Sequence, residues 1–291
     1  IIDSLEKAQI LLKAGANPNQ KDATRRCALH WAISNKNYAL CELLLKHQAN
    51  ANAYNIASEP LLARPLLQND TELKKLLIEN GANFQFAYDY IYAKLIGHRF
   101  ELTGSVDIVD TEGTFTEVDY EGFYLEFSLD LISFSLKNFK NNYAARAVSS
   151  WFDYIDTISY AIEQAQQLQQ HDHYLSEAKP QHDAIKKLMQ CDPLILPISQ
   201  EGHALAIVKY GNLMALCDRA SDSPPKDKIT IYYMNRPYKL DETLIYNLVY
   251  QKHSVKHIHR LVKNELSAQP VDTLPLPDQT MGNCSWANAE A

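Results

Sequence analysis

The sequence contains no run of about 18 apolar residues, so we expect no helix that spans a membrane. It also shows no secretory signal peptide. The net charge of −7 at pH 7 argues against a general nucleic-acid-binding protein, which would carry a basic excess or stripe. There is no Gly-x-Gly-x-x-Gly, no P-loop and no His-Glu-x-x-His pattern. We therefore expect no cofactor and no metal.

Cysteine is sparse, and its placement limits the kinds of site that it can form. The cysteines are odd in number and widely spread, and no two of them form a Cys-x-x-Cys pair. This pattern indicates neither a zinc ribbon nor a disulfide framework. It fits a reducing compartment, in which at least one thiol is available. The five are Cys27, Cys41, Cys191, Cys217 and Cys284.

A repeat occupies the first 86 residues. Leu11–Asn17 reads Leu-Leu-Lys-Ala-Gly-Ala-Asn, and related segments recur at Leu44–Asn50 and Leu77–Asn83, each 33 residues further on. This is the ankyrin period. Cys27–Ala32, which reads Cys-Ala-Leu-His-Trp-Ala, resembles the ankyrin signature Thr-Pro-Leu-His-x-Ala. The resemblance implies that His30 is a structural residue that hydrogen-bonds neighbouring backbone, and that a further repeat precedes the first residue.

The remaining chain is long enough for further domains, and its pattern changes twice. We expect a multidomain protein with all-α ankyrin repeats at 1–86, a mainly helical cap or linker at 87–183, and an α+β domain at 184–291. The chain begins with Ile rather than Met and ends inside an expected helix, so we expect it to be part of something longer.

The middle region carries long helical patterns and short alternating segments. One apolar stripe, formed by Phe123, Phe127, Leu131 and Phe134, is expected in a core rather than around a ligand. The expected elements are a helix at 88–96, short strands at 99–103, 106–109 and 115–118, and helices at 120–138 and 144–169.

The last region returns to mixed strands and helices. Gly211 and Asn212 separate two apolar segments, which is a hairpin turn signal. His253, His257 and His259 lie among basic residues, and we expect a solvated helix face there rather than a zinc site. The expected strands are 194–198, 204–209, 213–217 and 229–234. The expected helices are 184–189, 241–250 and 255–266. A proline-rich loop is expected at 270–277.

The strongest candidate for chemistry is Cys284, which precedes an Ala-rich, helix-prone stretch. A helix N-terminus and a nearby imidazole both lower a thiol pKa and so favour the nucleophilic thiolate. His203 begins one strand of the expected hairpin and Asp218 follows its partner, so we expect them to be neighbours. His203 would take the thiol proton, Asp218 would hold the imidazole, and Gln279 would donate to the oxyanion.

This order, with His203 and Asp218 before Gln279 and Cys284, resembles the permuted papain-like enzymes. That group includes the Ulp-type SUMO proteases, the adenoviral protease and the YopJ-type effectors. The resemblance covers about the last hundred residues and implies a papain-like cysteine protease fold. Gln279 and Cys284 are five positions apart where the family usually has six, and Asn283 and Ser285 flank the Cys in place of the usual Asp and Gly.

The whole chain, including Gly97–Gly104 and Asp119–Tyr124, resembles the ankyrin-repeat effectors that Legionella delivers by type IV secretion. The resemblance implies action in the host cell, in the cytosol or alternatively the nucleus, with a host protein bound through the repeats and a protein or peptide substrate.

Three functions remain open from the sequence. The first is a cysteine hydrolase that cuts a peptide or isopeptide bond. The second is a non-enzymatic interaction module with an inactive protease-like fold, in which Cys284 is a buried small apolar residue. The third is an acyltransferase of the YopJ sort.

Overall fold

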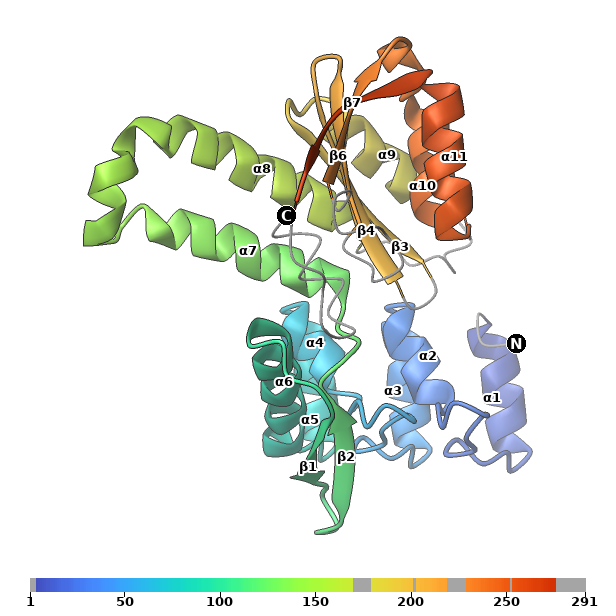
Figure 1. Cartoon of the computed structure of the whole chain (residues 1–291). Helices are drawn as coiled ribbons and strands as arrows, with labels where there is room; N and C mark the ends of the chain where they lie inside the picture. Colours follow the sequence, from blue (N-terminus) through green and yellow to red (C-terminus); the bar gives the residue numbers. More distant parts are fainter. Residues whose placement is uncertain (1–3, 170–178, 201–202, 219–228, 252, 276–291) are drawn as a thin grey trace. The chain divides into compact units, whose positions relative to one another are not determined.

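The structure is a computed structural model that describes residues 4–169, 179–200, 203–218, 229–251 and 253–275. It divides into two compact units, Ile1–Glu121 and Gly122–Ala291 (Figure 1). The first unit contains the repeats, and the second is a mixed α/β region with a five-stranded antiparallel sheet. The expected middle region contributes residues to both units. Its treatment as a separate domain stays a prediction.

The helices of the first unit stack as pairs around a shared apolar core. Apolar residues from successive helices bury one another in this core, and contact between neighbouring repeats is how ankyrin repeats gain stability. Asn37 and Asp70 cap helices by accepting hydrogen bonds from backbone N–H groups of Leu40 and Leu73. Leu29, Leu40, Leu62, Leu73 and Leu77 are fully buried. The helices are α1 (Leu5–Lys13), α2 (Ala28–Ser34), α3 (Tyr38–Lys46), α4 (Ala63–Leu67) and α5 (Thr71–Glu79).

The repeat period is visible in the hydrogen bonds between loops. The Asn19 side chain donates to Gln48 O at 2.9 Å and accepts from Asn50 N at 2.7 Å. One period later, Asn52 makes the same bridge to Gly81 O and to the N–H of the residue two positions on, both at 2.8 Å. Each loop thus satisfies backbone groups of the next.

His30 is structural, as the sequence predicts. Its side chain is buried in α2, and its Nδ1 accepts from Cys27 N at 3.1 Å. Burial, reinforced by the positive charges of Arg26 and Lys21, lowers the pKa of His30 to about 4. His30 is therefore neutral in the folded protein at neutral pH.

The first unit ends with a long helix and a β-hairpin. α6 (Phe84–Arg99) is followed by β1 (Ser105–Val109) and β2 (Phe115–Asp119), which pair antiparallel. Lys94 is buried, and its Nζ donates to the backbone oxygens of Asp119 at 2.6 Å and Glu121 at 2.5 Å. The expected strand at 99–103 is wrong: Arg99 ends the helix, and the chain then turns through Leu102, whose N–H bonds Gly97 O.

The second unit begins with a helical hairpin that projects beyond the sheet (Figure 1). α7 (Leu125–Phe139) runs antiparallel to α8 (Phe152–Gln169), with a 3-10 helix (Tyr143–Trp151) between them. Phe123 and Phe127 are buried as expected, but Phe134 is 65% exposed, so its assignment to a core is wrong. Ile132 and Leu136, on either side of it in α7, pack against the core of the second unit, so Phe134 lies on a different face of the helix.

The sheet has the order β3-β4-β5-β6-β7, with every neighbouring pair antiparallel. α9 (Lys179–Leu188), α10 (Glu242–Tyr250) and α11 (Val255–Glu265) cover one face (Figure 1), where their apolar residues share a core with those of the strands. The strands are β3 (Leu194–Gln200), β4 (His203–Tyr210), β5 (Leu213–Cys217), β6 (Ile229–Met234) and β7 (Ala268–Leu274).

β7 occupies most of the segment expected to be a proline-rich loop, so that expectation is wrong for 270–274. Pro270 lies across from Tyr232, where the register shifts between Ile231 and Tyr232. A proline lacks the N–H that a ladder needs, and edge strands and bulges are the places that tolerate it. Of the described helices, none has the length and apolar character needed to cross a membrane.

Gly97→Ala tests the packing of the hairpin on α6. A Cβ at position 97 would lie 2.5 Å from Tyr120 Cβ, which cannot swing away because it is attached to the backbone. Helix propensity alone would make the substitution stabilising by about 1 kcal/mol. We expect instead a loss of about 1–3 kcal/mol in the free energy of unfolding, measured by urea titration. A gain in stability would contradict the close approach.

The protonation of His30 should make stability depend on pH. The unfolded chain binds this proton near pH 6.5 and the folded chain only near pH 4, so stability is full above pH 6.5 and falls as the pH drops toward 4. The loss should reach roughly 3 kcal/mol. His30→Gln should flatten this part of the profile in urea unfolding, with His47→Gln as the control variant. Equal slopes for wild type and His30→Gln would contradict the assignment.

Candidate functional site

The β4–β5 hairpin forms the frame of the candidate site. Tyr210 pairs with Leu213 around the Gly211-Asn212 turn, so the predicted hairpin is confirmed. Cys217, the last residue of β5, pairs with Ala206. Continuing this register places Asp218 across from residue 205. The chain therefore brings Asp218 to the end of the hairpin at which β4 begins.

The backbone of His203 lies at the start of β4, paired with Gln200 of β3. His203 lies two residues before position 205, the position directly opposite Asp218. His203 and Asp218 are therefore diagonal neighbours on adjacent strands. Gln279 and Cys284 lie outside the described residues. The four-residue catalytic site therefore stays a prediction.

Asp218 is buried, with 3% of its surface exposed, and it contacts an imidazole. His259 Nε2 of α11 lies 3.3 Å from Asp218 Oδ2. This pairing was not expected, since we placed His259 on a solvated helix face. A signal was present in the sequence: Val255, Ile258 and Val262 follow the spacing of a buried helix face, and residue 259 lies at the edge of that face.

The other two histidines of this group fit the expected basic surface more closely. The rings of His253 and His257 stack with centroids 4.6 Å apart, and Arg260 Nη2 lies 3.0 Å from His257 Nδ1. Burial lowers the pKa of His253, and the neighbouring His257 lowers it further. Across the part of the chain that the structure describes, no three His, Cys, Asp or Glu side chains are grouped to hold a metal ion.

The described cysteines are unsuited to nucleophilic chemistry. All four, Cys27, Cys41, Cys191 and Cys217, are buried free thiols. Burial raises the pKa of Cys41 to about 12 and that of Cys217 to about 11, and it also raises the pKa of Cys191. A buried thiol with a raised pKa stays protonated and unreactive at neutral pH.

Comparison with known proteins identifies the class of the first unit. The family model for ankyrin repeats, in three copies, matches residues 2–87. Mouse (Mus musculus) inversin is 46% identical over 50 residues, which are 17% of this chain and 5% of inversin. Residues 2–87 therefore form ankyrin repeats, as the 33-residue period predicts.

The similarity extends beyond the repeats in one solved structure, that of the Legionella effector AnkH. The match has a TM-score of 0.77 and 36% sequence identity, and it covers 99% of this chain and 62% of the AnkH chain. Both units thus have counterparts in AnkH. This chain spans less than two thirds of AnkH and a small part of inversin.

A double-mutant cycle tests the Asp218–His259 contact. Combining Asp218→Asn with His259→Ala should reveal a coupling of about 1 kcal/mol in the free energy of unfolding, a value reduced because His259 is 40% exposed. His257→Ala, on the same helix, is the matched control and should add to Asp218→Asn without coupling. Equal coupling for the two histidines would argue against a specific pair.

Proposed function

We propose that this chain is part of a bacterial effector that binds a host protein through its ankyrin repeats and hydrolyses a peptide or isopeptide bond with its second unit. The observation that carries the hydrolase proposal is the meeting of the start of β4, at His203, with the buried Asp218 at the end of β5. A rigid hairpin is a suitable support for a catalytic base and the carboxylate that orients it.

The binding role rests on the repeat unit. Stacked repeats present an extended surface built from successive helices and loops, which ankyrin proteins use to bind other proteins. The similarity to AnkH, which is a Legionella effector, supports secretion into a host cell and action in its cytosol or nucleus.

In the proposed reaction, His203 accepts the proton of the Cys284 thiol, and the thiolate attacks the carbonyl carbon of the scissile bond. Gln279 donates a hydrogen bond to the oxyanion. The amine leaves with the proton from the imidazolium, and a thioester remains on Cys284. His203 then takes a proton from water, whose oxygen attacks the thioester, and the acid product leaves as the thiol is restored. An isopeptide bond of a ubiquitin-like conjugate would react in the same way.

A specific observation also favours the non-enzymatic alternative. Asp218 is already engaged by His259, a contact that fastens α11 to the end of the hairpin. In that case the carboxylate is structural, and the second unit serves as a binding surface.

Selective alkylation separates the two functions. With a depressed thiol pKa, Cys284 should react with iodoacetamide at pH 7 about tenfold faster than glutathione, measured by peptide mass spectrometry. The buried thiols of Cys191 and Cys217 provide an internal slow background. His203→Ala should reduce the Cys284 rate to that of glutathione, whereas His257→Ala should not. A wild-type Cys284 that reacts no faster than glutathione would remove the hydrolase proposal.

A further inference from the structure

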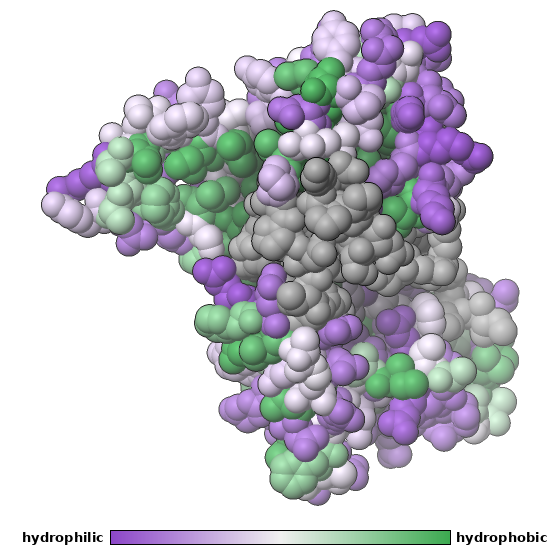
Figure 2. Space-filling view, viewed as in Figure 1, coloured by the Kyte–Doolittle hydropathy of each residue, from purple (hydrophilic) through white to green (hydrophobic). Residues whose placement is uncertain are grey.

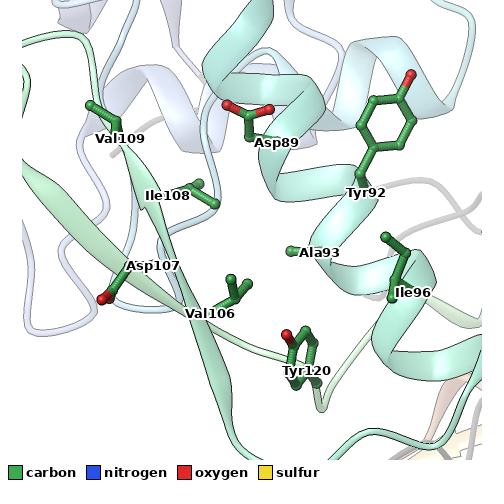
Figure 3. Close-up of a pocket in the computed structure, with 9 residues that line it drawn as sticks. All are labelled: Asp89, Tyr92, Ala93, Ile96, Val106, Asp107, Ile108, Val109 and Tyr120. Atoms are coloured by element: carbon green, nitrogen blue, oxygen red, sulfur yellow. The ribbon is translucent and has the colours of Figure 1, made fainter.

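A cavity of about 360 Å³ opens between α6 and β1 of the first unit (Figure 3). Its walls are apolar: Ala93 and Ile96 from the helix face Val106 and Ile108 from the strand. The ring of Tyr120 lies at one end. The volume suits a single long side chain better than a folded segment.

Asp89 gives this apolar cavity a negative charge. Its side chain is partly buried on the face of α6 that looks toward β1 (Figure 3). Gln85 Nε2 donates to its Oδ1 at 2.7 Å, and no lysine or arginine among the described residues forms an ion pair with it. The following segment, residues 101–121, contains acidic side chains and no Lys or Arg. A cation entering the cavity could therefore pair with the Asp89 carboxylate.

The surface beside the cavity is apolar and exposed. Every fourth residue along α6 contributes to one stripe, so the side chains stand above one another. The rings of Phe84 and Tyr88 stack with centroids 6.0 Å apart, and those of Tyr88 and Tyr92 with centroids 5.7 Å apart. Hydrophobic residues reach the surface over α6 (Figure 2). The stripe consists of Phe84, Tyr88, Tyr92, Ile96 and Phe100, each at least 38% exposed.

We propose that this cavity binds a lysine or arginine side chain of a partner polypeptide, and that apolar residues flanking that side chain lie on the α6 stripe. The long apolar stem of a basic residue matches the walls, and its charged head matches the Asp89 carboxylate. An anionic ligand would be repelled, and a wholly apolar ligand would bury the carboxylate charge with no cation beside it. The inference rests on the proposed protein-binding role and names the chemistry of the partner.

The test uses the whole chain with Cys284→Ser, so that no hydrolysis interferes. The probes are acetylated and amidated peptides of sequence Gly-Leu-Arg-Leu-Gly and Gly-Leu-Gln-Leu-Gly. Methyl NMR signals of Ala93, Ile96, Val106 and Ile108 report directly on the cavity walls. We expect the Arg peptide to shift these signals and to bind about tenfold more tightly than the Gln peptide, the worth of one charge-assisted hydrogen bond.

Asp89→Asn should remove that preference. Glu112→Gln is the matched control, because it makes the same charge change at an exposed residue between β1 and β2 that does not line the cavity. Equal binding of both peptides, or equal loss in both variants, would overturn the proposal. If a host protein binds the repeats while the peptides are not distinguished, the inference fails alone. If the Arg preference holds and Cys284 is inert, the hydrolase proposal fails alone.

Discussion

The buried side chain of Lys94 holds the last helix of the repeat unit to the β-hairpin that follows it. An ankyrin stack must end somewhere, and its last helix needs a partner for the face that no further repeat covers. Here α6 is held to the hairpin by Lys94, whose Nζ binds the backbone oxygens of Asp119 and Glu121. Burial lowers the pKa of Lys94, while the charges of Asp119, Glu59 and Glu121 oppose that change. The hairpin, and with it the cavity beside β1, depends on this attachment and on the contact between Gly97 and Tyr120.

Local signals were enough to predict most of the fold. A repeat buries the same positions every 33 residues, so the helical repeats could be predicted from self-similarity. The failures have tertiary causes. Pro270 appeared to forbid a strand, but an edge position beside a register shift admits it. Phe134 belongs to an apolar stripe, yet the face of α7 that packs against the core carries Ile132 and Leu136, and Phe134 stays exposed.

The site could be predicted only in part, for the same reason. The turn at Gly211-Asn212 is local, so the meeting of the ends of β4 and β5 followed from the sequence. The His259 contact joins residues 41 positions apart and depends on how α11 packs on the sheet. Asp218 follows β5 directly and is buried where α11 packs on the sheet. The alternation of apolar residues within one strand does not reveal which helix will cover the strand's end. The cavity between α6 and β1 likewise needs both elements in place.

The contact between Asp218 and His259 is compatible with either role for the second unit. A carboxylate has two oxygens and can accept several hydrogen bonds, so binding one imidazole through Oδ2 does not prevent it from orienting another. The discriminating group is the thiol. The described cysteines are all buried, and burial raises the pKa of Cys41, Cys191 and Cys217, so a nucleophile in this chain must be the exception among its cysteines. Catalysis by this unit therefore requires that Cys284 differ from the rest in both access to solvent and pKa, whereas a binding role requires neither.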